Sequence, residues 1–386
     1  MSAAVLAVFW LSVAAIAYAQ FGYLACLAVL SRVIQRPVKR APIHPSVSLI
    51  VPVYNGGGLI SSKIENLLAL DYPPELIEII IVDDCSTDDT ASIVGAGLRP
   101  GPTLRLLRLD RRSGKAAALN AGLEIAKGEI IGFSDVAAML EPRALSLAVE
   151  RFVAPTVGCV SSEDEVIAGR GVAASESLYT RIDAVMRRLE SAIASATGMN
   201  GSFYLARREL CPPFPLDLAT DMFTSLHCVG RGFRAVVEER SKVRLIAQAS
   251  ARREFERKVR TMVTGLRAQR AFIRLLNPLR FGVFSIFLVS HKLFRYLTPV
   301  FVVMAVASTA YLSPSRAAFT WLLWAELVLM CIGLLQIGAQ TLTARCGAAG
   351  FPAFICVTIA AAMMGWYRYF RGERYETWQP TERSPV

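Results

Sequence analysis

Long apolar runs occupy both ends of the chain, and the charged residues are concentrated between them. Ala3–Leu30 carries no charge and exceeds the roughly 20 apolar residues that cross a hydrocarbon core. Basic residues follow at once between Arg32 and Arg40. We therefore expect a transmembrane anchor with the amino terminus outside and the next residues in the cytosol. Ala17-Tyr18-Ala19 resembles a signal-peptide cleavage site, but the apolar run continues past it and no basic leader precedes it, which favours an uncleaved anchor.

The carboxyl-terminal third predicts three more spans, which makes about four in all. They lie at about Leu297–Leu312, Ala317–Ala339 and Phe351–Trp366. The apolar stretch Phe281–Leu293 is too short to cross a bilayer and is expected to lie at its surface. Four spans would place the tail on the far side of the membrane, although three arginines near residue 370 run against the positive-inside tendency.

The middle of the chain alternates short apolar runs with helical patterns. Four strands are expected, at Val47–Asn55, in the first half of Ile77–Thr90, at Leu104–Asp110 and at Glu129–Asp135, with a helix over Gly114–Gly128. Strands that alternate with helices are typical of a mostly parallel, Rossmann-like α/β sheet. Ligands of such sheets bind at the carboxyl ends of the strands, where polar residues gather in this sequence. These residues are Asn55, Asp83, Asp84 and Asp135.

These patterns divide the chain into five parts. The segment after Arg252 mixes many basic residues with apolar ones, as expected of helices lying along lipid headgroups. The expected parts are an anchor (1–40), an α/β domain (41–250), interfacial amphipathic helices (251–293), three transmembrane helices (294–370) and a tail (371–386).

Composition supports a membrane protein and argues against a cysteine-based framework and against nucleic-acid binding. The hydrophobic fraction is 54%, too high for a purely soluble chain of 386 residues. The eight cysteines form no CxxC pair, so neither a zinc site nor a disulfide framework is indicated. The net charge of +11 is not accompanied by any nucleic-acid motif, so we expect no nucleic-acid partner. Anionic membrane lipids or a diphosphate substrate explain the charge better.

Four motifs in register resemble the family 2 glycosyltransferases with a GT-A fold. They are "VSLIVPVYN", "IIIVDDCSTDDT", "GKAAALNAG" and "GFSD". With the membrane frame, the chain most resembles the branch that contains the cellulose, chitin-oligosaccharide, hyaluronan and poly-N-acetylglucosamine synthases. The resemblance implies an inverting transfer of a sugar from a UDP-sugar to a saccharide or lipid-linked acceptor at the inner membrane face.

The resemblance also assigns residues to the nucleotide sugar. The donor-binding residues it implies are Pro52, Tyr54, Asn55, Asp83, Asp84, Lys115, Asp135, Arg257 and Arg260. Asp83 and Asp84 could instead serve a simple strand-to-helix turn, and Lys115 could be a solvated surface lysine.

Asp135 matches the first acid of the family's Asp-x-Asp motif, but Ala137 stands where the second acid is expected. Magnesium takes only one or two protein carboxylates when substrate phosphates fill other positions. We therefore expect a Mg²⁺ or Mn²⁺ site on Asp135 of reduced affinity. The acidic run Glu163–Glu165 could replace the missing acid or be a solvated turn.

The remaining chemistry is assigned to the second half of the domain. Asp221 matches the end of the family's acidic motif and is the expected general base, or else an ordinary helix N-terminal aspartate. Arg260 retains the arginine of the Gln-x-x-Arg-Trp motif, whereas Thr261 replaces its tryptophan, which argues against processive synthesis. The acceptor contacts implied by the resemblance are Asn200, Gly201 and Ser202, in a segment that could also be a plain β-turn.

Three interpretations remain open from the sequence. One is a processive synthase, whose few spans would need a homo-oligomer or an export partner to complete a channel. Another is a transferase that adds one or a few sugars to a lipid-linked acceptor. The third is an inactive homologue that acts as an assembly partner, supported only by Ala137. The sequence does not identify the sugar, the linkage or the acceptor.

Overall fold

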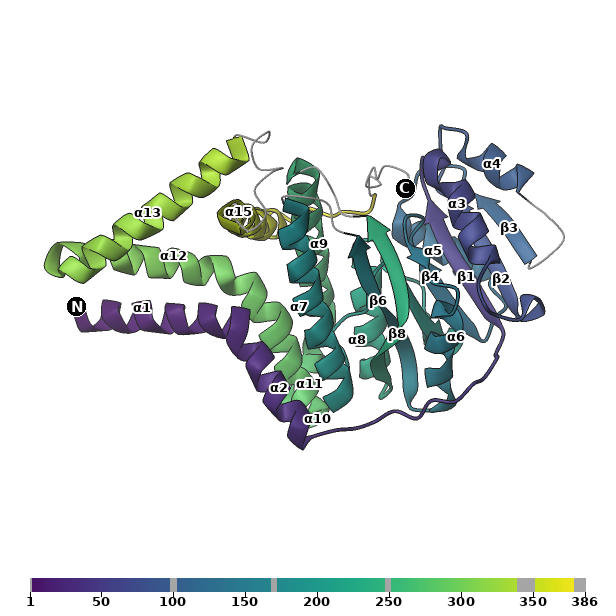
Figure 1. Cartoon of the computed structure of the whole chain (residues 1–386), viewed down its shortest axis with the longest axis horizontal. Helices are drawn as coiled ribbons and strands as arrows, with labels where there is room; N and C mark the ends of the chain where they lie inside the picture. Colours follow the sequence, from purple (N-terminus) through teal and green to yellow (C-terminus); the bar gives the residue numbers. More distant parts are fainter. Residues whose placement is uncertain (1, 98–102, 168–171, 247–250, 339–350, 378–386) are drawn as a thin grey trace.

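The computed structural model describes residues 2–97, 103–167, 172–246, 251–338 and 351–377. An α/β domain packs at one end of a group of long apolar helices (Figure 1). The strands are β1 Val47–Val53, β2 Ile77–Asp83, β3 Thr103–Arg108, β4 Ile130–Ser134, β5 Met139–Leu140, β6 Val157–Ile167, β7 Phe203–Arg207 and β8 Arg234–Ile246.

Helices cover both faces of the sheet and connect it to the apolar layer. The helices of the domain and of the layer beside it are α3 Gly57–Leu68, α4 Thr90–Ala96, α5 Lys115–Ile125, α6 Ala144–Val149, α7 Val172–Ile193, α8 Thr220–Gly230 and α9 Ala251–Ala271. The helices of the apolar part are α1 Ser2–Ala17, α2 Tyr23–Val33, α10 Pro278–Phe281, α11 Val283–Phe287, α12 Phe294–Leu312, α13 Ala317–Gly338 and α15 Phe351–Phe370.

The eight strands form one mixed sheet in the order β3-β2-β1-β4-β7-β6-β8-β5. β1 to β4 are parallel, which confirms the four expected strands, whereas β7 runs antiparallel to both β4 and β6. β1 is buried along its whole length because helices cover both of its faces. Leu49 packs in the core on one face with Ile60 of α3, and Ile50 packs on the other with Leu119 of α5.

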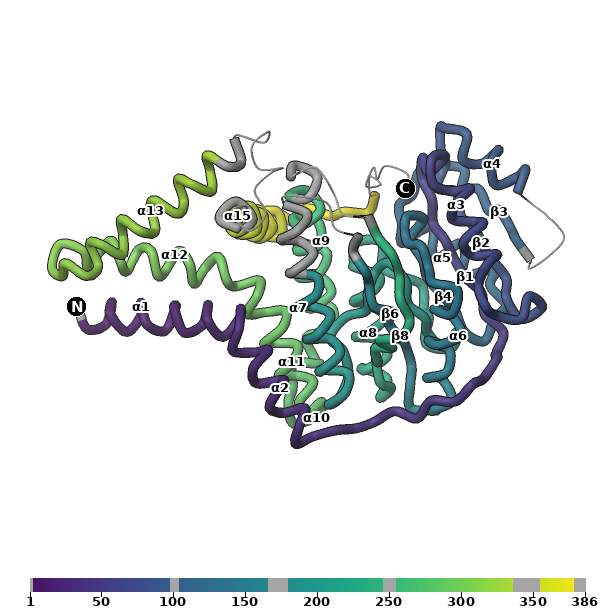
Figure 2. Tube along the Cα trace, viewed as in Figure 1, coloured from purple at the N-terminus to yellow at the C-terminus, as the bar shows by residue number. Residues whose placement is uncertain are grey.

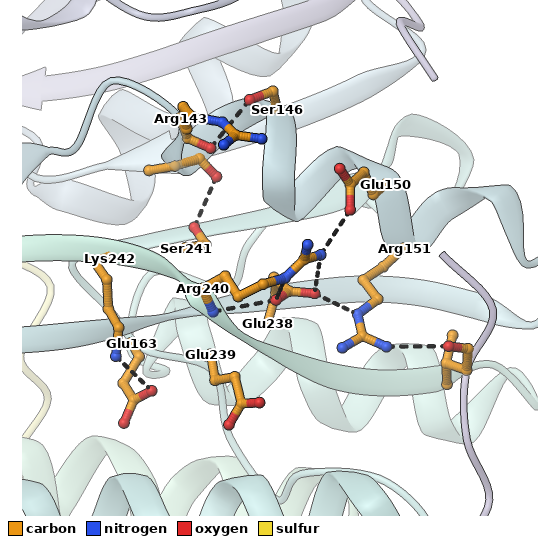
Figure 3. Close-up of polar contacts among 12 residues, drawn as sticks. Arg143, Ser146, Glu150, Arg151, Glu163, Glu238, Glu239, Arg240, Ser241 and Lys242 are labelled. Carbon is orange, nitrogen blue, oxygen red and sulfur yellow. Dashed lines mark hydrogen bonds and ion pairs between the residues drawn. The ribbon is translucent and has the colours of Figure 1, made fainter. Parts of the chain in front are cut away.

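Arginines fasten the linker between α2 and β1 to the domain. Arg234 Nη1 donates to the carbonyl of Arg36 at 2.7 Å, and Arg151 Nη1 donates to that of Val38 at 3.1 Å. Figure 3 shows Arg151 and Arg240 on either side of the carboxylate of Glu238. Burial alone would raise the pKa of Glu238, but hydrogen bonds from Arg240 and the charge of Arg151 lower it. The first apolar helix is thus tied to the sheet by charged groups.

Three helices in the described part of the chain are long and apolar enough to cross a membrane. They are Ala3–Val33, Val283–Ser315 and Ala317–Leu335. The stretch Phe281–Leu293, expected to be interfacial, is largely part of the second of these helices. Their outward faces expose large apolar side chains, for example Leu11 at 70% and Trp321 at 76%, as lipid-facing surfaces do.

The fourth expected span is not among these three helices. It lies in α15, which is seen nearly end-on in the view where α1, α12 and α13 run lengthwise (Figure 1). α15 packs against α9 and α13, and the chain then runs to the upper edge of the sheet (Figure 2). The start of the tail therefore lies on the same side of the apolar helices as the sheet, opposite to the side expected from four spans. Arg368 and Arg371 lie at that end of α15, where the chain turns toward the sheet.

Candidate functional site

A cavity of about 430 Å³ lies where the strand ends meet α8 and α9. Cavities of this size suit small ligands, which commonly occupy about 300–1,000 Å³. It brings together most of the residues expected from the sequence, although they come from distant parts of the chain. The expected residues that line it are Pro52, Lys115, Asp135, Asn200, Gly201, Ser202, Asp221, Arg257 and Arg260.

Asp135 and Lys115 form an ion pair inside this cavity. Asp135 follows β4, and Lys115 is the first residue of α5. Lys115 Nζ lies 2.5 Å from Asp135 Oδ1 and 3.5 Å from the carbonyl oxygen of Gly201. The Lys115 side chain is 28% exposed and the Asp135 side chain is 43% exposed, so a ligand can reach both. Lys115 is therefore not a solvated surface lysine.

Asp164 lines the same cavity, whereas its acidic neighbours point elsewhere. Successive side chains of a strand alternate between its two sides, and Asp164 lies on β6. Glu163 instead pairs with Lys242 at 3.0 Å. Ser202 connects the two cavity acids, since its hydroxyl donates to Asp164 and its carbonyl accepts from the Asp135 backbone at 2.9 Å. The sequence left open whether the run Glu163–Glu165 replaces the missing acid or forms a solvated turn; of the three residues, Asp164 alone lines the cavity.

These two carboxylates fit a divalent cation only with help from a substrate. Among the described residues, no group of three histidine, cysteine or acidic side chains could hold a metal alone. Asp135 and Asp164 supply the one or two carboxylates that Mg²⁺ usually takes from a protein, and diphosphate oxygens and water would have to complete the shell. The cation would also compete with the Lys115 ammonium for Asp135.

Asp221 lies in the first turn of α8, beside the segment that precedes β7. A Cβ on Gly201 would lie 3.4 Å from Asp221 Oδ2, so the glycine keeps the space in front of this carboxylate open. Asn200 is only 7% exposed, and its Nδ2 has no hydrogen-bond partner among the described residues. Buried amide donors are usually satisfied, so an unpaired one on a cavity wall indicates a ligand contact.

Arg257 and Arg260 are one turn apart on α9 and both face the cavity. Burial, with Arg257 beside it, lowers the pKa of Arg260, while the nearby Asp135 opposes this change. A partly buried guanidinium of this kind gains from an anionic ligand. Thr261 also lines the cavity, so no indole provides a stacking platform at this position.

The remaining expected donor residues do not line this cavity and make structural contacts. Asp84 Oδ1 and Oδ2 accept the backbone N–H groups of Ser113 and Gly114 at 2.6 and 2.8 Å, which fixes the turn before Lys115. Asp83 is fully buried and accepts the N–H of Ser86 at 2.9 Å.

Asn55 and Tyr54 hold the neighbouring loops. Asn55 adopts a left-handed conformation, with φ at 50°, and its Oδ1 accepts the N–H of Thr87 at 2.9 Å. The guanidinium of Arg112 lies over the Tyr54 ring, 4.0 Å from its centroid. The contacts of Asp83 and Asp84 are those of residues that stabilise turns, which was the alternative to nucleotide binding. Their role in nucleotide binding stays a prediction.

Two groups of cavity residues had no sequence signal. Lys292 and Tyr296 come from the second apolar helix, and Tyr375 and Glu376 come from the tail expected on the far side of the membrane. Their place in the cavity depends on how distant helices pack, which no local pattern reports.

A buried lysine supports the loop that carries Asp135. Lys63 on α3 is fully buried, and its Nζ donates to Ser134 Oγ at 2.8 Å and to the carbonyl of Ala138. Burial lowers the pKa of Lys63 to about 7, although the charge of Asp135 opposes this. The strand end beneath the cavity therefore rests on a group that loses its charge near neutral pH.

We expect Lys63→Met to flatten the pH dependence of stability above neutrality. Between pH of about 7 and the ordinary lysine pKa, the unfolded chain keeps a proton that the native chain has released, so the free energy of unfolding rises with pH. The total rise attributable to Lys63 is on the order of a few kcal/mol. Unfolding of the detergent-solubilised chain across this pH range measures it, with exposed Lys127→Met as control. An unchanged slope in Lys63→Met would contradict the assignment.

Comparisons with known proteins agree with the geometry. Residues 48–199 match the family model described as glycosyl transferase family 2. The chain is 37% identical over 107 residues to the succinoglycan biosynthesis protein ExoO of Rhizobium meliloti, covering 28% of this chain and 30% of that protein. It is 34% identical over 119 residues to a β-monoglucosyldiacylglycerol synthase of Synechocystis, covering 30% and 25% respectively. The matches thus span only a quarter to a third of these relatives.

A solved structure resembles nearly the whole chain in its fold. The mannosyltransferase PcManGT from Pyrobaculum calidifontis, in complex with GDP-Man and Mn²⁺, has a TM-score of 0.74 at 23% identity. The likeness covers 95% of this chain and 100% of that one. The parallel strands, their connecting helices and this likeness confirm the expected GT-A fold. Residues 48–199 therefore match the glycosyl transferase family 2 model, in a chain that has a GT-A fold and helices able to cross a membrane.

Proposed function

We propose that the chain is a membrane-bound, inverting glycosyltransferase that moves a sugar from a UDP-sugar onto a lipid-linked acceptor. The observation that carries this proposal is that Asp135, Asp221 and Arg260 share one cavity with Lys115. A nucleotide sugar requires cations around its diphosphate and a base beside the acceptor hydroxyl. All of these groups line the one space.

In the proposed reaction, the Asp221 carboxylate removes the proton of an acceptor hydroxyl. The oxygen then forms a bond to the anomeric carbon as the bond from that carbon to the diphosphate oxygen breaks, which inverts the centre. Lys115, Arg257 and Arg260 offset the negative charge that develops on the departing UDP. A divalent cation held by Asp135 and Asp164 would supply further positive charge to the diphosphate.

The nucleotide is proposed to extend from the cavity past Pro52 toward the loop held by Asp83 and Asp84. In that position Asn55 and Tyr54 lie at the edge of the uridine site. Asn200, Gly201 and Ser202 are then placed to contact the acceptor sugar or the transferred sugar. The Asn200 amide, which has no partner among the described residues, can donate to the sugar hydroxyls.

A lipid-linked acceptor is favoured over a growing polysaccharide by two features of the cavity wall. Lys292 and Tyr296 extend the cavity to the second apolar helix, so an acceptor anchored in lipid can reach Asp221 from the membrane. Thr261 lies where processive relatives place a tryptophan. We propose that the domain faces the cytosol, since basic residues after α2 and after α15 lie on its side of the apolar helices.

A donor screen tests this function. Membranes containing the chain are incubated with labelled UDP-sugars and GDP-sugars, and nucleotide release and product size are measured. We expect release of UDP from one donor and a single lipid-soluble product. A ladder or high polymer would support the processive alternative, and no release from any donor would support the inactive homologue.

Removal of divalent metal should abolish transfer, and Mg²⁺ or Mn²⁺ should restore it. Asp164→Asn should raise the metal concentration for half-maximal activity by about tenfold, because one of two carboxylates is lost. Glu165→Gln, an exposed neighbour on the same strand, is the control and should leave the metal titration unchanged. Full turnover in EDTA would remove the cation from the mechanism.

A further inference from the structure

The segment that follows α15, residues 371–377, crosses from the membrane side to the catalytic face, and we refer to it as the C-terminal strap. Two contacts hold it to α9 and to the loop before α8. Arg267 Nη2 donates to the carbonyl of Gly372 at 3.2 Å, and Arg374 Nε lies 3.9 Å from Asp217 Oδ2. Arg267 also binds Asp217 at 2.7 Å, so one arginine joins the strap and the loop.

Tyr375 of the strap is held at the wall of the cavity. Arg368 Nη1 donates to its hydroxyl oxygen at 2.5 Å, and Arg368 Nε lies 3.7 Å from the Glu373 carboxylate. Because the hydroxyl accepts from Arg368, its own proton can be donated to an anion. Tyr375 lines the cavity together with Arg260.

The end of the strap packs on the turn that carries Lys115. A Cβ on Gly114 would lie 1.8 Å from the carbonyl oxygen of Glu376, and Gly114 has φ at +92°. Only glycine allows both the backbone conformation and this close approach. The strap therefore connects α9, which carries Arg260, to the turn before Lys115 that Asp84 fixes.

The strap is a wall of the cavity and not a plug. With Tyr375 and Glu376 in place, about 430 Å³ remains open beside them, enough for a small ligand. Asp135 and Lys115, where the proposed diphosphate lies, line the same space.

We propose that the C-terminal strap is a donor-binding element, in which the Tyr375 hydroxyl donates to the diphosphate of the bound nucleotide sugar and the strap closes the donor side of the cavity. This inference rests on the proposed function. It predicts that nucleoside diphosphate binding slows amide exchange in residues 372–377 and that loss of the Tyr375 hydroxyl weakens binding.

The first test measures UDP and GDP binding to the detergent-solubilised full chain by calorimetry. Tyr375→Phe should weaken binding of the nucleotide that the wild type prefers by about tenfold, as expected for a hydrogen bond to a charged group. Tyr367→Phe is the matched control, because it also removes one tyrosine hydroxyl, but this hydroxyl accepts from Arg371 Nη1 at 3.0 Å and does not line the cavity, so the variant should bind as the wild type does. Thermal unfolding of each variant checks that the fold is intact.

The second test needs no variant. Saturating nucleotide should slow amide hydrogen exchange in residues 372–377 of the wild type, whereas exchange in β3 should not change. If the wild type transfers sugar and Tyr375→Phe binds nucleotide equally well with no exchange protection of the strap, the strap proposal fails and the transferase function stands. If the wild type binds neither UDP nor GDP, both proposals fail.

Discussion

Asp221→Asn should abolish sugar transfer while leaving nucleotide binding almost unchanged. Asparagine keeps the size and hydrogen-bonding reach of the side chain but cannot accept the proton of the acceptor hydroxyl. General-base catalysis contributes about 10²–10⁴-fold, so we expect a loss of transfer of that order. Single-turnover transfer to membrane lipids and calorimetric binding of UDP separate the two effects.

Asp89→Asn is the control for this substitution. Asp89 also lies at the start of a short helix, α4, but does not line the cavity. Its substitution should preserve transfer. If Asp221→Asn retains wild-type transfer, Asp221 is an ordinary helix N-terminal residue and the base must be another group.

Arg260→Ala should reduce turnover by about 10²–10³-fold, the usual cost of removing one donor that stabilises a developing charge. Arg260 faces the cavity from α9, and burial lowers its pKa because the charged guanidinium has lost solvation. Negative charge that develops on the leaving diphosphate therefore stabilises the charged guanidinium and is stabilised by it. Arg260→Lys keeps the charge but loses the two-pronged grip and should fall between wild type and alanine.

The position of the arginine, and not the basic surface of α9, should account for this loss. Arg270→Ala removes an exposed arginine from the same helix and serves as the control. Transfer is measured at saturating donor, with membrane association checked by flotation. Equal losses in Arg260→Ala and Arg270→Ala would point to headgroup binding instead of leaving-group stabilisation.

The parallel half of the sheet was predictable because strands buried on both faces appear in the sequence as continuous apolar runs. β1 and β2 read as continuous apolar runs that end on polar residues, and both ends could be located from sequence. β6 was missed because its charged residues Glu163, Asp164 and Glu165 are consecutive, so no alternation marks that half of the strand; in the sheet, Glu163 pairs with Lys242 of β8. Without a partner strand, such a stretch reads as a solvated loop.

The cavity was predictable where its residues follow a strand or begin a helix, as Asp135, Lys115 and Asp221 do. Residues supplied by long-range packing were not. α15 has the apolar composition of a span, but Trp366 donates to the carbonyl of Tyr296 at 2.8 Å, and Gly365 lets α15 approach Met262 of α9. These contacts set its direction, and with it the place of Tyr375 in the cavity.

The most direct test is a structure of the full chain with a bound UDP-sugar analogue that cannot be hydrolysed. We predict that the diphosphate lies between Lys115 and Arg260, with the cation on Asp135, and that the anomeric carbon faces Asp221. A nucleotide bound elsewhere, or an anomeric carbon turned away from Asp221, would contradict this account.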